Sequence, residues 1–159
     1  MRYFSSLCLV LMLGLSLAGC SGSGDAIKND TRDNIGSHPR VVITAIGNET
    51  FVVRYAYRFL RVVDEPGDIM LETEWRDLQP TDDERALGVT AVRNKFLVQA
   101  RPRNRTTSLA NSYTVIVRTE TEARTVDNDY WTPIAITPER KEYIDEIVDF
   151  YETEMRIQG

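Results

Sequence analysis

The chain has 159 residues, of which 42% are hydrophobic and 27% are charged, and its formal net charge is −5. This composition is that of a folded domain. The excess of acidic residues disfavours general nucleic-acid binding, which needs a basic surface. The length leaves room for one small domain behind a targeting segment.

An apolar run of about a dozen residues follows Arg2, which is the length of a signal-peptide core and too short to cross a bilayer. The run ends at Leu17-Ala18-Gly19-Cys20. These four residues resemble the lipobox of bacterial lipoproteins at every position. The resemblance implies cleavage before Cys20 and attachment of diacylglycerol to its sulfur. We therefore expect residues 1–19 to be a lipoprotein signal peptide, with an ordinary secretory signal as the alternative.

The lipobox also implies a location. Cys8 would leave with the signal and Cys20 would carry lipid, so no thiol would remain for a disulfide, a metal or a nucleophile. Ser21 follows the cysteine, where an Asp retains lipoproteins at the inner membrane in the enterobacterial sorting pattern. The expected location is therefore the outer membrane, facing the periplasm, with the cytoplasmic membrane as the alternative.

A flexible tether is expected over residues 20–39, followed by a single domain over residues 40–159. Ser21-Gly22-Ser23-Gly24 has linker composition, and the residues up to Ser37 are polar with little to bury. His38, the only histidine, lies in this tether. A catalytic histidine needs a fixed neighbour and a walled site, so His38 is given no role.

The next segment favours a helix by its spacing and a strand by its residue types. Val41-Val42-Ile43 is predicted to be a short strand or an extended lead-in. A helix is then expected from Asn48 to Val63, with a cap at Asn48. Its apolar residues recur at helical offsets, although such residues prefer strands, and this alternative stays open: Val52, Tyr55, Ala56, Phe59, Leu60 and Val63.

Alternation of apolar and polar side chains predicts strands over residues 69–78, 94–100 and 112–121. Trp75 is expected to pack against a helix. Tyr130-Trp131 is expected to return to the core as a short extended piece. Both tryptophans are thus predicted to anchor helices on the sheet, and a carbohydrate platform is the alternative.

Two further helices have clear start signals. Thr81-Asp82-Asp83-Glu84 fits the capping-box pattern and predicts a short helix from Asp82 to Gly88. Thr137 as cap and Pro138 at the first helical position predict the last helix. Its apolar stripe would face the sheet, and consists of Ile144, Ile147, Val148, Tyr151 and Met155.

These elements predict an α+β domain in which a small antiparallel sheet of about three strands is covered on one face by two helices. The stretch from Gly67 to Trp75, and Trp131 before a closing helix, resemble the BamC-type lipoproteins of outer-membrane barrel assembly. They are also similar to lipopolysaccharide-assembly lipoproteins. The chain departs from BamC in having room for only one domain.

Arg101, Arg103 and Arg105 form the densest positive cluster of an acidic chain. Arginines bind phosphate or carboxylate through paired hydrogen bonds. The cluster is therefore a candidate contact for a lipid headgroup, a lipopolysaccharide phosphate or an acidic partner. The alternative is a solubilising loop that discourages pairing between sheet edges.

Catalytic and metal signatures are missing from the sequence. It contains no GxSxG, glycine-rich phosphate loop or HExxH, and its acidic run at Asp82 does not match a calcium loop. Glu72 and Glu74 would share a strand face, as an acid/base pair requires, but a solvated strand face is the favoured interpretation. No catalytic residue, metal or cofactor is therefore predicted.

The sequence thus predicts a membrane-anchored, non-enzymatic lipoprotein, held through Cys20, that acts as an accessory or partner-binding module in the bacterial cell envelope. The expected partner is an envelope protein, and no nucleic acid is expected. The alternative is a lipoprotein that binds lipid or a small ligand in a pocket between helices and sheet, with the arginine loop at its mouth.

Overall fold

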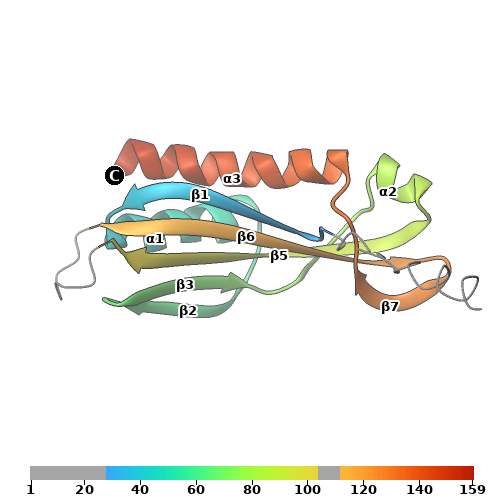
Figure 1. Cartoon of the computed structure of the whole chain (residues 1–159), viewed down its shortest axis with the longest axis horizontal. Helices are drawn as coiled ribbons and strands as arrows, with labels where there is room; N and C mark the ends of the chain where they lie inside the picture. Colours follow the sequence, from blue (N-terminus) through green and yellow to red (C-terminus); the bar gives the residue numbers. More distant parts are fainter. Residues whose placement is uncertain (1–27, 104–111) are drawn as a thin grey trace, which may run out of the picture.

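The computed structural model describes residues 28–103 and 112–159, which form a single antiparallel sheet with helices against it (Figure 1). Within these ranges no helix is both long and apolar enough to span a membrane. The elements, in chain order, are β1 (Asp30–His38), α1 (Arg40–Gly47), the π-helical segment η1 (Asn48–Arg54), β2 (Phe59–Glu65), β3 (Asp68–Thr73), β4 (Arg76–Leu78), α2 (Asp82–Ala86), β5 (Val89–Pro102), β6 (Tyr113–Thr125), β7 (Asn128–Pro133) and α3 (Pro138–Gln158).

The long strands β5 and β6 form the centre of the sheet. They pair from Val89↔Thr125 to Pro102↔Tyr113, and the strand order is β1-β6-β5-β3-β2. β4 pairs with β5, and β7 pairs with β6. Residues alternate between buried and more exposed along both central strands, as expected for a sheet with one covered face.

The prediction of a small sheet of about three strands covered by two helices was wrong. The fold is of the α+β kind, but the described residues form a sheet of seven strands with three α-helices. The three predicted strands belong to this sheet, and the first of them is divided into β3 and β4. The other strands, β1, β2 and β7, are short or lie at edges, where few side chains need to be apolar.

One additional strand lies inside the expected tether. Asp30–His38, within residues 20–39, forms β1 and pairs with β6 from Asp30↔Glu120 to His38↔Tyr113. Ile35 is its only buried hydrophobic residue among those described. The strand is held by backbone hydrogen bonds to β6, which residue composition does not reveal. The folded region therefore begins before residue 40.

The prediction for residues 41–63 also needs correction. Val41-Val42-Ile43 belongs to α1 and not to a strand, and the helical segment ends at Arg54. The N–H of Tyr55 donates to the carbonyl of Thr50, five residues back, and Ala56 has a φ of 53° that turns the chain into β2. The strand preference of the β2 residues prevailed over their helical spacing.

The predictions for the other two helices were confirmed. α2 begins at Asp82 with the capping box of Thr81 and Glu84, and the Thr137 hydroxyl accepts the N–H of Arg140 at the start of α3. Figure 1 shows α3 running along the sheet. The whole predicted stripe of α3 is buried: Ile144, Ile147, Val148, Tyr151 and Met155.

Aromatic rings fill the space between the helices and the sheet. The Phe51 ring lies 5.2 Å from that of Phe96 and 5.4 Å from that of Tyr151, and Tyr57 packs edge-on against Phe96 at 5.1 Å. All four side chains are buried. The core therefore lies on one face of the sheet, and the opposite face is left for other contacts.

Candidate functional site

The face of the sheet turned away from the helices is the candidate functional surface, and we call it the uncovered face. Every second residue of β5 and β6 points there, because the intervening residues are buried under the helices. β5 contributes Arg93, Lys95, Leu97, Gln99 and Arg101, and β6 contributes Thr114, Ile116, Arg118, Glu120, Glu122 and Arg124.

An arginine lies between two tryptophans on the uncovered face. The guanidinium carbon of Arg93 is 4.7 Å from the ring centroid of Trp75 and 4.4 Å from that of Trp131. Lys95 also lies over Trp75, at 5.0 Å, and Arg124 lies over Trp131, at 4.5 Å. These distances are those of cation–π contacts. We call these five side chains the Trp–cation row.

The prediction that Trp75 and Trp131 anchor helices on the sheet was therefore wrong. Both are only partly buried, and their contacts are with cations of the uncovered face. The predicted strand 69–78 is interrupted after Thr73, which breaks the alternation that would have put Trp75 beside Ile69 and Leu71. The cations also occupy ring surface that a carbohydrate would need for stacking.

Carboxylates fix the cations of this row. Both Nε and Nη2 of Arg93 donate to Oε2 of Glu122, at 2.9 and 2.7 Å. The Lys95 ammonium lies 3.2 Å from Glu120 and 3.8 Å from Glu72. Arg124 lies 3.7 Å from Asp129. The row is thus a network of alternating charges and rings with a defined geometry.

The structure separates the two glutamates considered as an acid/base pair. Glu72 lies on β3 and interacts with Lys95 on the uncovered face. Glu74 follows the end of β3 and lines a pocket together with Tyr57 and Arg76. The two carboxylates therefore do not face one cleft, and this arrangement gives no support to acid/base chemistry.

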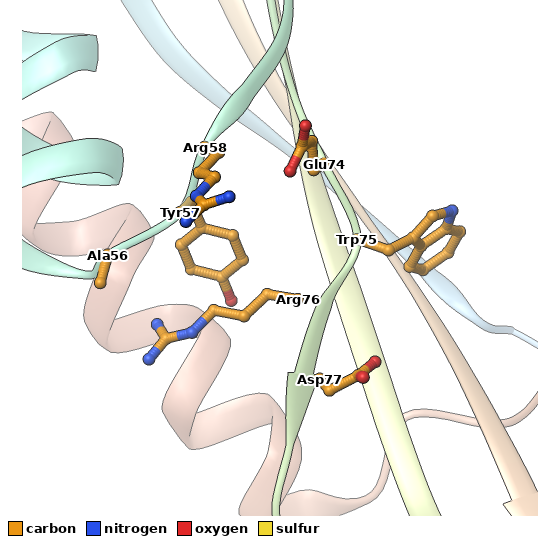
Figure 2. Close-up of a pocket in the computed structure, with 7 residues that line it drawn as sticks. All are labelled: Ala56, Tyr57, Arg58, Glu74, Trp75, Arg76 and Asp77. Carbon is orange, nitrogen blue, oxygen red and sulfur yellow. The ribbon is translucent and has the colours of Figure 1, made fainter.

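That pocket has a volume of about 220 Å³ and lies where the chain leaves η1 (Figure 2). The Arg76 guanidinium lies 5.0 Å from the Tyr57 ring centroid and donates to the carbonyl of Tyr55. Trp75 points away from this pair in Figure 2. The residues that line the pocket are Ala56, Tyr57, Arg58, Glu74, Trp75, Arg76 and Asp77.

Tyr57 has a structural role at the base of this pocket. Its hydroxyl donates to Oδ1 of Asn94 at 2.6 Å and lies 3.4 Å from the hydroxyl of Tyr143. Burial, reinforced by the neighbouring Tyr143, raises the pKa of Tyr57 well above its ordinary value. The phenol is therefore held neutral and serves as a hydrogen-bond donor to Asn94.

Arginines gather in a second pocket, on the uncovered face. It has a volume of about 240 Å³ and is lined by Arg32, Gln99, Arg101, Thr114, Ile116 and Arg118. Of the predicted arginine cluster, Arg101 lines this pocket, Arg103 is exposed just beyond β5, and Arg105 lies outside the described residues. The structure thus joins Arg101 to Arg32 and Arg118, which the sequence analysis missed because strand register was unknown.

The remaining sequence candidates lie elsewhere. Cys20 is outside the described residues. His38 ends β1, and its Nε2 is 3.1 Å from the carbonyl oxygen of Ile35. Within residues 28–103 and 112–159, no group of three or more His, Cys, Asp or Glu side chains is placed to hold a metal ion.

A buried ion pair joins α2 to α3. The Arg140 guanidinium donates to Oε1 of Glu84 at 2.8 Å and to Oε2 at 2.7 Å, with 3% and 0% of these side chains exposed. Arg140 also donates to the carbonyl of Gln79, and the Thr81 N–H donates to Glu84. Since both charges have several partners, the pair is a structural connection.

Comparisons with protein-family models and with curated proteins do not identify the function of this site. No protein-family model matches the chain, and no curated protein is significantly similar to it in sequence. The function proposed below is therefore inferred from the residues and contacts of this chain alone.

Proposed function

We propose that this chain is a membrane-anchored, non-enzymatic lipoprotein that binds a protein partner in the bacterial cell envelope through its uncovered face. The observation that carries the proposal is the Trp–cation row, in which Trp75, Arg93 and Trp131 stand together outside the core. Tryptophan and arginine are enriched among residues that dominate binding energy at protein interfaces.

The order already present in the row strengthens this proposal. Arg93 is fixed by two indole rings and by Glu122, so little side-chain freedom would remain to be lost on binding. Immobilising a flexible side chain at an interface costs about 0.5–1.5 kcal/mol. A preorganised surface of this kind avoids much of that cost.

The anchor would hold the domain close to a membrane. Asp30, the first residue of β1, follows Cys20 by ten positions (30 − 20). Ten residues reach at most about 35 Å when fully extended. Lipid on Cys20 would thus keep the uncovered face within reach of partners at that membrane, and Ser21 favours the outer membrane on its periplasmic side.

The core disfavours the alternative, a ligand pocket between helices and sheet. Phe51, Phe96, Tyr57 and Tyr151 occupy that space with rings in mutual contact. Inserting a ligand there would require large aromatic side chains to leave a close-packed core. The uncovered face is therefore the better candidate for recognition.

Two measurements test the proposal on the full chain in a bacterial host. Cys20→Ala is expected to move the protein from the membrane fraction to the soluble fraction. The control Ser23→Ala is expected to leave the protein in the membrane fraction. A photo-crosslinking residue at Gln99, on the uncovered face, is expected to capture an envelope protein. The matched control is the same residue at Glu142, exposed on α3. Crosslinks from Glu142 but not from Gln99 would contradict the proposed surface.

A further inference from the structure

The cations of the uncovered face divide into two groups. Arg93, Lys95 and Arg124 each lie within 4.0 Å of a carboxylate. Among the described residues, no ion pair of this length includes Arg32, Arg101 or Arg118. Within the part of the chain that the structure describes, the second group thus has no carboxylate at ion-pair distance, on a chain whose net charge is −5.

Strand register forces two of these arginines together. Arg32 of β1 is the direct antiparallel partner of Arg118 of β6. Like charges directly opposite each other in a sheet are destabilising. The pair therefore contributes a small unfavourable energy to folding, which an anion bound between the two arginines would relieve.

Arg101 joins them from the third strand, β5, which pairs with the other side of β6. All three arginines line the pocket of about 240 Å³, together with Gln99 and Thr114, which add an amide and a hydroxyl group. Ile116 is its apolar lining residue. The pocket thus presents several hydrogen-bond donors, and none of its described lining residues is acidic.

Three carboxylates lie near this group along the strands, including Asp68, which precedes the Ile69 partner of Ala100 and so lies beside Arg101 in register. Asp30 and Glu120 form the next pair on the same face of β1 and β6, two residues from Arg32 and Arg118. Glu120 is already 3.2 Å from the Lys95 ammonium. None of these three carboxylates lies within 4.0 Å of an arginine nitrogen of this pocket.

We propose that Arg32, Arg101 and Arg118 form a binding site for a phosphate group. Guanidinium groups match phosphate oxygens with paired, charge-assisted hydrogen bonds, and three of them on neighbouring strands can share the oxygens of one phosphate group. The phosphate could come from an anionic lipid headgroup or from free phosphate or a soluble ester. The site shares the uncovered face with the proposed function but does not need the lipid anchor, so it is tested separately.

The first experiment titrates inorganic phosphate into the full chain in detergent by calorimetry. Saturable binding is expected, and Arg118→Gln is expected to weaken it about tenfold or more, as for loss of hydrogen bonds to a charged group. Arg156→Gln makes the same charge change at the end of α3, where Arg156 is exposed and paired with Glu152. It should leave the affinity unchanged.

The unfolding temperature distinguishes a variant that has lost the site from a variant that is misfolded. Without phosphate, Arg118→Gln is expected to raise the unfolding temperature slightly, because it removes the repulsion with Arg32. With phosphate, the wild type should be stabilised by mass action and Arg118→Gln should not. Equal stabilisation of both would overturn the proposal.

A competition experiment distinguishes the sources. Phosphatidylglycerol or phosphatidylcholine is added to the detergent micelles before the phosphate titration. Arg118-dependent competition by phosphatidylglycerol, but not by phosphatidylcholine, supports a lipid headgroup, while phosphate binding without competition supports a soluble ligand. If neither phosphate nor phosphatidylglycerol binds, the proposed site is overturned. An equal effect of Arg118→Gln and Arg156→Gln on the phosphate affinity would also overturn it.

Discussion

Arg140 donates two hydrogen bonds to the carboxylate of Glu84, and both side chains are buried. Glu84 is at the same time the residue that closes the capping box of α2, where it accepts the N–H of Thr81. A helix-start motif, visible in the sequence, thus also holds the first turn of α3 against α2. Removing either partner would leave a buried charge uncompensated.

Arg140→Met is expected to lower the free energy of unfolding by about 3–5 kcal/mol, the usual cost of breaking a buried ion pair from one side. Urea unfolding of the full chain measures this. Lys141→Met is the matched control, because Lys141 pairs with Asp145 in solvent and should cost less than about 1 kcal/mol. The double variant Arg140→Met/Glu84→Leu should recover part of the loss. A similar effect of Arg140→Met and Lys141→Met would contradict the role of the pair.

Acid is expected to weaken the same connection. Burial alone would raise the pKa of Glu84, but hydrogen bonds from Arg140 and the Thr81 N–H hold that pKa below its ordinary value of 4.5. The unfolded chain therefore binds more protons in this range. The stabilisation is complete above the ordinary pKa and is lost as pH falls through the lower folded value.

Urea midpoints measured between about pH 3 and 6 test this expectation. Glu84→Gln should flatten the fall in stability at the acidic end. Some slope should remain, because the pKa of Asp83 is also lowered. Burial raises the pKa of Asp83, but hydrogen bonds from the Thr81 hydroxyl and the Glu139 N–H lower it more strongly. Glu142→Gln, exposed on α3, is the control. An unchanged slope in Glu84→Gln would contradict the assignment.

The stack between Arg93 and Trp131 is expected to contribute a measurable coupling. A double-mutant cycle with Arg93→Met and Trp131→Leu should give about 0.5–2 kcal/mol, the range for cation–π contacts. A cycle of Trp131→Leu with Arg85→Met, on the exposed side of α2, should give a coupling near zero. Equal couplings in the two cycles would show that the geometry of the row carries no energy of its own.

Gly47→Ala is expected to destabilise the fold despite the better helix propensity of alanine. A methyl group at this position would overlap Cδ1 of Leu71, which is buried in the core. Overpacking costs about 1–3 kcal/mol, against a helix gain of about 1 kcal/mol.

Thermal unfolding can compare this variant with Gly67→Ala. A methyl group at Gly67 meets no atom within 4 Å, so its effect should be small. Adding Leu71→Val to Gly47→Ala should relieve the overlap and return part of the stability. A Gly47→Ala variant as stable as the parent would show that the Leu71 side chain moves aside at no cost.

Several elements could be predicted because their signals are local. Thr81 with Glu84, and Thr137 with Pro138, mark helix starts within a few residues, and the stripe of α3 repeats at helical spacing. The central strands alternate over many positions. The lipobox, which ends at Cys20, is also a local motif, and its implication for the anchor stays a prediction.

The predictions failed for elements whose secondary structure or orientation depends on a segment that is distant in the sequence. β1 is polar and became a strand because β6 offered backbone hydrogen bonds at its edge. β2 satisfied a helical pattern by coincidence, yet it pairs with β3 as an edge strand. The position of Trp75 depended on the interruption between β3 and β4.

The sequence by itself determined the α3 stripe, the capped helix starts and the alternation of β5 and β6, because these depend on residues that are neighbours along the chain. Only the tertiary structure decided that Arg32, Arg101 and Arg118 meet in one pocket and that Trp75 and Trp131 enclose Arg93. The physical reason is strand register. Which side chains become neighbours across a sheet is set by hydrogen bonding between distant segments and by the burial of one face.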